Sequence, residues 1–252
     1  MALFGKTSNP AMRSEIFSSA SRDTTSTEVM TVNGAINKSL LLLLLIILGG
    51  SYTWKVAFDT VNPSAVTPWM IGGLIGGLIT ALIIIFKPTT ARIAAPIYAI
   101  FEGLFLGGIS AFFEAAYHGI VIQAVGLTIG TLLIMLFVYR TGIIKVNKQF
   151  MAGIVAATGA VALFYIISMF IGWFGGDTSY ISGNGNLSII ISGVIVVIAA
   201  LNLVVDFHII DEGAKQGAPK YMEWYGAFAL MVTLVWLYLE LLKLLAKVSS
   251  RR

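Results

Sequence analysis

Seven apolar stretches, each close to 20 residues long, constrain this chain more than any other feature. They are predicted to span residues 36–54, 69–86, 93–113, 119–139, 150–174, 187–210 and 222–246. A helix of about 20 apolar residues crosses the hydrocarbon core of a bilayer and satisfies its own backbone hydrogen bonds there. The sequence therefore predicts an all-α fold, a polytopic membrane helical bundle with seven transmembrane helices in one domain, residues 36–246.

The composition excludes an ordinary soluble domain. Hydrophobic residues make up 58% of the chain and charged residues only 11%, whereas soluble domains carry about 25% charged residues. The absence of cysteine excludes a disulfide framework, thiolate catalysis and cysteine-bound zinc. No zinc-protease, hydrolase or phosphate-loop motif is present. We therefore expect no enzyme activity and no cofactor, with the lipid bilayer rather than a nucleic acid as the partner.

Polar segments flank the predicted bundle: an N-terminal arm at residues 1–35 and a basic tail at 247–252. Basic residues concentrate in the arm and in the loops that contain Lys87, Arg140 and Lys215, whereas the alternate loops carry a single lysine. The positive-inside rule therefore places the N-terminus and the loop at Lys215 in the cytoplasm. The basic tail would then lie outside, which leaves an alternative of six spans plus a re-entrant C-terminal helix.

Glycines four residues apart recur in the predicted spans. The pairs are Gly72/Gly76, Gly73/Gly77, Gly103/Gly107 and Gly126/Gly130. Small residues at this spacing let helix backbones approach closely in lipid. We expect them to pack helices within one chain, and the alternative is a weak homo-oligomer that uses the same spacing.

Four acids lie within or at the ends of the apolar spans, and they are the candidate ion- or proton-sensing residues: Asp206, Glu102, Glu223 and Glu240. A charged side chain in hydrocarbon costs several kcal/mol, so intramembrane acids are functional by default. Asn202 lies one turn before Asp206 on the same helix face. The alternative for Asp206 is an interfacial aspartate that reaches toward the headgroups.

The predicted hairpin geometry selects a partner for Asp206. A turn centred near Lys215 places Asp206 opposite residue 224, so Glu223 is the expected neighbour. Two such carboxylates cannot both ionise cheaply, and the pair would hold a proton or attract calcium transiently. The alternative for Glu223 is a solvated acid at the start of a helix. Glu240 lies about 25 Å farther along the helix, where an ion pair with Lys243 is expected.

Glu102 is the deepest acid of the third predicted span, with Tyr98 one turn earlier on the same face. A buried glutamate is either protonated or paired. Its candidate partners are Asp206, Arg92 and Lys87. We expect a functional or gating role rather than a passive protonated side chain.

Several phrases of the sequence, taken together, carry a family resemblance. They are Met30-Thr31-Val32 with Gly34 and Lys38, Pro96-Ile97-Tyr98-Ala99 with Glu102, Asn202-Leu203 with Asp206-Phe207, Met222-Glu223-Trp224-Tyr225, and Thr233-Leu234-Val235-Trp236. As a set they resemble the Bax inhibitor-1 family, in its bacterial YccA-like branch, over about residues 30–246. The resemblance implies a seven-helix bundle with a central last helix, in a bacterial cytoplasmic membrane.

The resemblance also implies a pH-sensitive calcium leak, governed by an aspartate on helix six that pairs with one on helix seven. Asp206 matches the first aspartate, but the partner position falls near Thr233, which cannot ionise. The expected function is thus a pH-sensitive cation leak that uses intramembrane carboxylates. The alternative is a non-conducting interaction protein that modulates a membrane-anchored ATP-dependent protease or a stress response.

Overall fold

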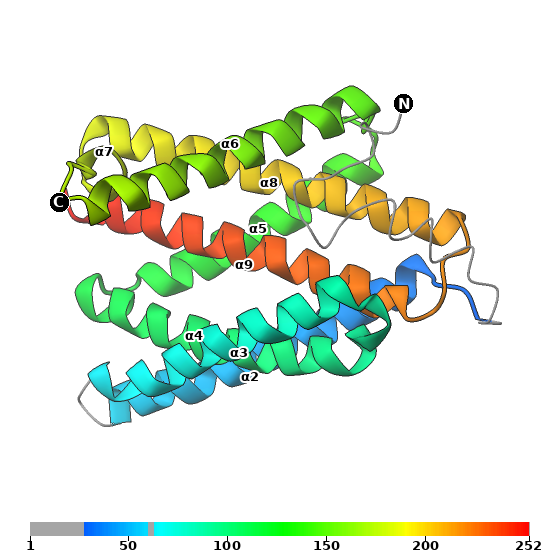
Figure 1. Cartoon of the computed structure of the whole chain (residues 1–252), viewed down its shortest axis with the longest axis horizontal. Coiled ribbons are helices and arrows are strands. Elements are labelled where there is room, and N and C mark those ends of the chain that lie inside the picture. Colours follow the sequence, from blue (N-terminus) through cyan, green and yellow to red (C-terminus); the bar gives the residue numbers. More distant parts are fainter. Residues whose placement is uncertain (1–27, 60–62, 252) are drawn as a thin grey trace. The chain divides into compact units, whose positions relative to one another are not determined.

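The computed structural model describes residues 28–59 and 63–251, and most of them are helical (Figure 1). The long helices are α2 (Val32–Asp59), α3 (Thr67–Phe86), α4 (Ala91–Ala116), α5 (Ile120–Arg140), α6 (Lys148–Trp173), α8 (Asn186–Lys215) and α9 (Met222–Ser249). Short helices η1 (Pro63–Val66), η2 (Pro88–Thr90) and α7 (Ser179–Ser182) lie in the connections. Most of the predicted polar arm, residues 1–27, lies outside the described residues.

All seven long helices are long and apolar enough to cross a membrane, which confirms the predicted all-α bundle of seven spans. The last helix, α9, runs for 28 residues without interruption, so the alternative of a re-entrant C-terminal helix is wrong. The helix also continues through Lys247 to Ser249, into the segment predicted as a tail.

The largest boundary difference that affects the site is at the end of α8. The sequence predicts an end at residue 210, but the helix continues to Lys215. Asp211 and Lys215 form an ion pair of 2.8 Å across this last turn, which is the i,i+4 spacing that supports a helix. Hydropathy marks where a helix leaves hydrocarbon, not where its hydrogen bonds stop. A glycine in the left-handed region, Gly217 at φ 70°, follows the end.

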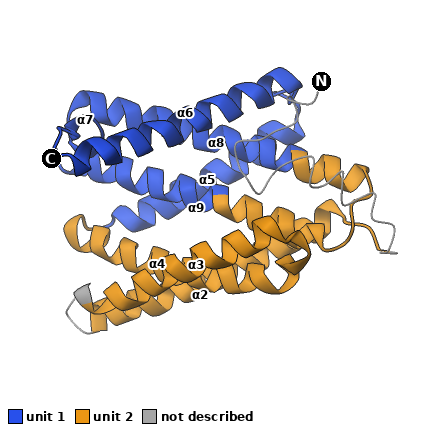
Figure 2. Ribbon diagram, in the orientation of Figure 1, with its two compact units in different colours: residues 1–9, 119–208, 233–252 blue, residues 10–118, 209–232 orange. Residues whose placement is uncertain are grey.

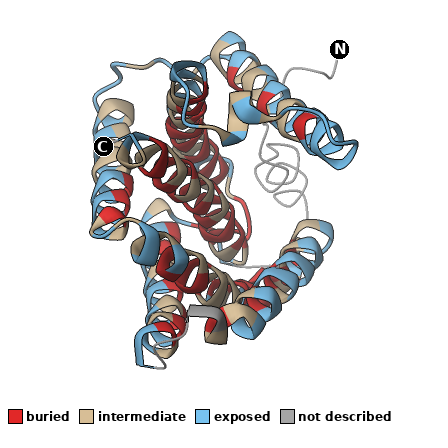
Figure 3. Cartoon of the chain, turned by 90° about the vertical axis from the view of Figure 1, so that its left-hand side faces the viewer, coloured by how far each residue is buried: buried red, intermediate tan, exposed pale blue. Residues whose placement is uncertain are grey.

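Buried residues form stripes along the helices, and many apolar side chains on the other faces are exposed (Figure 3). Exposed apolar faces of this extent are expected for helices that contact lipid. The last helix is the most buried of the seven: 67% of its central apolar window is buried, compared with 11% in α6. The central position that the family resemblance implies for this helix stays a prediction.

The chain divides into two compact units (Figure 2). One unit, which we name the α2–α4 unit, contains the described residues up to 118 and also residues 209–232. The other, the α5–α8 unit, contains residues 119–208 and 233–252. The first half of α9 therefore belongs to one unit and the second half to the other.

In the α2–α4 unit, α4 packs against both α2 and α3. Glycines make the contact between α4 and α2 very close. A Cβ added at Gly103 would lie 2.4 Å from the Ile46 carbonyl oxygen, and one added at Gly107 would lie 2.3 Å from the Gly50 carbonyl oxygen. The predicted packing through this glycine pair is confirmed.

The other predicted glycine pairs divide into two groups. On α3, a Cβ at Gly73 would lie 2.6 Å from the Phe101 carbonyl oxygen of α4, again a close contact, and one at Gly76 would lie 2.7 Å from the Phe101 ring, whereas one at Gly72 would meet no described atom within 4 Å. On α5, a Cβ at Gly126 or Gly130 would meet no described atom within 4 Å. Within the part of the chain that the structure describes, the predicted packing is therefore not found for the α5 pair.

Candidate functional site

Polar side chains gather on the facing sides of α6, α8 and α9 in the α5–α8 unit, and we name this set the polar column. Its members are Thr158 and Tyr165 of α6; Ser192, Asn202 and Asp206 of α8; and Thr233, Trp236, Glu240, Lys243 and Lys247 of α9. On α8 and α9 these residues recur at multiples of three and four, so each helix presents them on one face.

Asp206 lies at one end of the polar column and is 1% exposed. The Thr233 hydroxyl donates a hydrogen bond to its carboxyl group. The other carboxyl oxygen, Oδ2, has no hydrogen-bond partner among the described residues. A buried carboxyl group with one neutral donor can be a neutral acid with a proton left to donate, or an anion that attracts a proton or a cation from elsewhere.

Two contacts define the register between α8 and α9. Asp206 contacts Thr233, and Ser192 accepts a hydrogen bond of 2.7 Å from Lys247. The two contacts are 14 residues apart on each helix, as an antiparallel pair requires, and about 21 Å apart along the helix axis. The polar column thus extends across much of a bilayer core.

This register corrects the expected neighbour of Asp206. The prediction placed residue 224 opposite Asp206, but the facing residue is Thr233, nine residues later. Part of the error arose because α8 continues five residues beyond its predicted end. The contact itself is centred between residues 219 and 220, rather than near Lys215 as the prediction placed it. The family resemblance placed the partner position near Thr233, and the structure places Thr233 there.

Asn202 joins the same end of the polar column to α6. Its side-chain amide donates to the Thr158 hydroxyl at 2.9 Å and to the Ile198 carbonyl oxygen, one turn earlier, at 2.8 Å. Thr158 is a neutral residue that sequence reasoning missed, because no pattern in α6 distinguishes it from other threonines in apolar helices.

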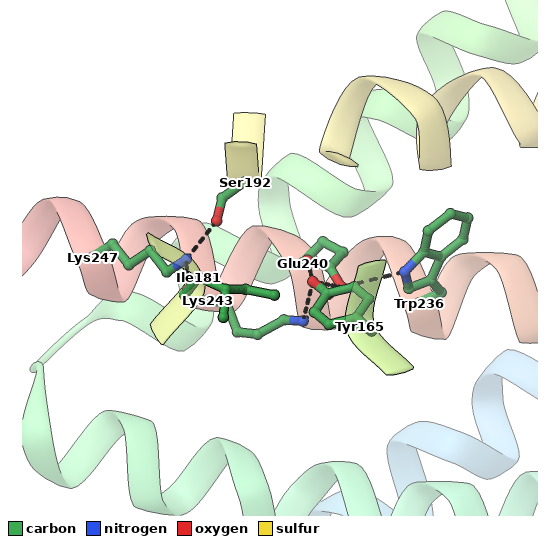
Figure 4. A network of polar contacts seen from close by, with 7 residues as sticks. All are labelled: Tyr165, Ile181, Ser192, Trp236, Glu240, Lys243 and Lys247. Carbon is green, nitrogen blue, oxygen red and sulfur yellow. Dashed lines mark hydrogen bonds and ion pairs between the residues drawn. The ribbon is translucent and has the colours of Figure 1, made fainter. Parts of the chain in front are cut away.

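Glu240 lies in the middle of the polar column and is 2% exposed (Figure 4). Lys243 donates to it at 2.6 Å, which confirms the predicted ion pair. The Tyr165 hydroxyl lies 3.0 and 2.9 Å from its two oxygens, and the Trp236 indole N–H donates at 3.3 Å. Glu240 is therefore a buried carboxylate with donors from two helices, a more elaborate site than the predicted pair.

Lys247 lies at the end of the polar column that is remote from Asp206, and it is 9% exposed. Its ammonium donates to the Ile181 carbonyl oxygen at 2.5 Å and to the Ser192 hydroxyl at 2.7 Å (Figure 4). Sequence reasoning placed Lys247 in the tail. The spacing of Lys243 and Lys247 on the face of Glu240 could have identified it.

Glu223 lies in the α2–α4 unit and is 0% exposed, so the alternative of a solvated acid is wrong. Lys38 of α2 forms an ion pair with one of its oxygens. The other accepts from the Thr31 backbone N–H at 2.9 Å and the Thr31 hydroxyl at 3.1 Å, and it lies 3.4 Å from the Lys220 ammonium. Glu223 thus neutralises cations of its own unit, whereas Asp206 belongs to the other unit.

The segment before α2 is fastened to the α8–α9 turn beside Glu223. Val29 and Pro219 form an antiparallel bridge, and the Met30 N–H donates to the Ala218 carbonyl oxygen at 2.7 Å. Gly34 leaves the space for the carboxylate, because a Cβ there would lie 2.1 Å from a Glu223 oxygen. Two of the phrases that carry the family resemblance therefore meet in space.

Glu102 also lies in the α2–α4 unit, where it is half-buried. The Tyr98 hydroxyl donates to its carboxylate, in line with their predicted common face. On α3, Gly77 provides room, since a Cβ there would lie 3.1 Å from Glu102 Oε2. The ion pairs of the described residues include none between Glu102 and Arg92 or Lys87.

The described residues contain no group of three or more acidic or histidine side chains placed to hold a metal ion. Transient calcium binding at the acids therefore stays a prediction. In chemical terms, the polar column offers one acid with a spare oxygen, a neutralised glutamate and a cation with neutral partners.

The comparisons with known proteins give one match. No curated protein and no solved structure is significantly similar to the chain. The profile of the family described as Bax inhibitor 1 like matches residues 9–250, nearly the whole chain. The chain therefore belongs to the Bax inhibitor 1 like family.

Proposed function

We propose that this integral membrane protein conducts a pH-sensitive leak of cations, calcium among them, along the polar column. Asp206 is the residue that exchanges the proton. The protein would lie in a bacterial cytoplasmic membrane with its N-terminus in the cytoplasm, as the basic loops and the YccA-like phrases of the sequence suggest.

One observation carries the proposal: a buried carboxyl group with a spare oxygen begins a row of polar groups about 21 Å long. Apolar packing would be the cheaper way to fill a helix interface in lipid. Acids within membrane spans otherwise mark ion and proton paths.

The threonine at position 233 changes how such a site would respond to pH. Two coupled acids lose their protons in two steps that belong to the pair. Asp206 instead faces a hydroxyl group that keeps its proton. The leak should therefore follow the titration of a single group, with the steepness of one proton.

Calcium flux from proteoliposomes tests the proposal. The wild-type protein should release calcium, and its rate should vary with pH. Asp206→Asn keeps the size and a hydrogen-bonding side chain but removes the exchangeable proton, so the flux of this variant should lose its pH dependence.

The matched control is Asp211→Asn, which makes the same chemical change five residues farther along α8, in a partly exposed ion pair with Lys215. This variant should behave as the wild type does. Equal calcium release from empty and protein-loaded liposomes would refute the leak. An unaltered pH profile in Asp206→Asn would refute the role of Asp206.

The fastening of the chain before α2 supports a second candidate function, an interaction protein that modulates a membrane-anchored protease. The Lys220 N–H donates to the Glu28 carbonyl oxygen at 3.1 Å, so whatever binds the preceding residues is attached to the α8–α9 turn. Such a protein passes no ions, and deleting residues 1–27 should abolish co-purification of the protease. Unchanged co-purification would contradict this function.

A further inference from the structure

Lys247 is a buried cation whose two hydrogen-bond acceptors are both neutral. Its ammonium donates to a carbonyl oxygen of α7 and a hydroxyl oxygen of α8. The ion pairs found among residues 28–59 and 63–251 do not include it. A buried charge ordinarily requires an ionic partner, so this one calls for an explanation.

The simplest explanation is a structural latch. Lys247 lies in the last turn of α9, where the helix dipole favours a cation, and it bonds the Ile181 carbonyl oxygen near the end of α7. However, the Ser188 hydroxyl already donates to the same oxygen at 3.1 Å. The carbonyl group therefore has a partner without Lys247, and a latch alone does not require a charge there.

The position of Lys247 suggests a further role. Ser192, which accepts from the ammonium, lies on the same face of α8 as Asp206 and 14 residues before it. A cation that followed this face from Asp206 to the far end of the polar column would meet the ammonium group there.

The charges around this end do not cancel that of Lys247. Lys243 is matched by Glu240, and Arg251, whose Nε donates to a loop carbonyl oxygen at 2.6 Å, adds a charge of the same sign. The acid of the adjoining loop is Asp177, which is exposed. The backbone N–H and hydroxyl of Ser179 bind its carboxylate and hold its pKa below the usual value.

We propose that the Lys247 ammonium is the electrostatic barrier that closes this end of the polar column to cations. The inference rests on the proposed leak and identifies the residue that keeps it small. Coulomb repulsion is proportional to the charge of the moving ion. The free-energy barrier is therefore twice as high for a divalent cation as for a monovalent one. If its removal raises the flux of a monovalent cation by some factor, it should raise the flux of a divalent cation by the square of that factor.

Ion selectivity separates this role from a latch. Lys247→Gln keeps a hydrogen-bond donor and removes the charge. If potassium flux from proteoliposomes rises about tenfold, calcium flux should rise about a hundredfold, and leakage of an entrapped small sugar should not change. The Lys247→Arg variant retains the charge, so its potassium and calcium fluxes should stay as low as those of the wild type. Equal increases for both ions and the sugar would indicate lost packing and overturn the barrier, as would an unchanged calcium flux.

A second measurement needs no flux and no change at Lys247. The chain has no cysteine, so Ser188→Cys introduces one thiol beside Ser192. The rate at which each charged methanethiosulfonate modifies this cysteine is divided by its rate with a small free thiol. This relative rate should be at least about tenfold higher for the negatively charged reagent than for the positively charged one. Adding Lys247→Gln should remove the preference.

Equal relative rates in Ser188→Cys would overturn the barrier, and so would a thiol that neither reagent reaches, because an electrostatic barrier requires an aqueous path. These outcomes differ from failure of the leak itself. If wild-type and Lys247→Gln liposomes all retain calcium, the proposed leak is wrong, and the thiol rates still decide whether the ammonium repels cations.

Discussion

At the scale of single residues, the partners of the buried acids define different roles. Glu223 and Glu240 each have a lysine within ion-pair distance, and such pairs are neutral overall. Asp206 has a threonine and Glu102 a tyrosine, both neutral donors. Charge exchange is therefore expected at Asp206 and Glu102, whereas Glu223 and Glu240 position helices.

The Lys38–Glu223 pair gives a stability prediction at this scale. Glu223→Gln leaves the Lys38 ammonium, whose side chain is only 19% exposed, without its anion. Breaking a buried pair by removing one partner is costly, and we expect the free energy of unfolding in detergent to fall by about 3 kcal/mol.

The double variant Lys38→Met/Glu223→Gln removes both charges and should recover most of that loss. Asp211→Asn, which breaks an exposed pair, should change the unfolding free energy little. If Glu223→Gln were as mild as Asp211→Asn, the pair would not fasten α2 to α9.

At the scale of helices, packing follows from where glycines face another backbone. In lipid, helices associate through close van der Waals contact rather than the hydrophobic effect. The spacing of four residues predicted this contact for α3 and α4, but it occurs equally on α5, where the glycines face open space. Sequence spacing identifies a surface suited to packing, and only the fold decides whether a helix lies against it.

This contrast predicts opposite effects of the same substitution. Gly103→Ala on α4 places a methyl group 2.4 Å from the Ile46 carbonyl oxygen, so α2 and α4 must separate. Overpacking of this kind costs about 1–3 kcal/mol, which thermal unfolding in detergent would measure as a lower Tm. Gly126→Ala should leave the Tm unchanged or raise it, because alanine favours helix. A similar loss in both variants would refute the difference in packing.

At the scale of the whole molecule, the described basic residues of the C-terminal end are bound within their own unit. Lys243, Lys247 and Arg251 all donate to oxygens of the same unit. Basic residues determine orientation when they lie free in loops near the membrane, and these three are bound within the folded protein. An external C-terminus is therefore compatible with a cytoplasmic N-terminus.

Introduced cysteines test this orientation, because the chain has none of its own. Ser182→Cys, in the connection between α6 and α8, and Gln216→Cys, in the α8–α9 turn, are both at exposed positions. A membrane-impermeant thiol reagent should label the first in intact cells and the second only after permeabilisation. The reverse pattern would place the N-terminus outside.

The sequence by itself determined the seven spans and the importance of Asp206, because a bilayer imposes length and apolarity on each local segment and makes a charge within it conspicuous. It did not determine the partners. Lys38 and Glu223 are 185 residues apart in the sequence, and Tyr165 and Glu240, which form a hydrogen bond, are 75 residues apart. Side-chain pairing depends on where each helix ends and on the turn between the helices. The extension of α8 by five residues accounts for only part of the nine-residue difference between the expected and the observed position opposite Asp206. Only the tertiary structure supplied that register.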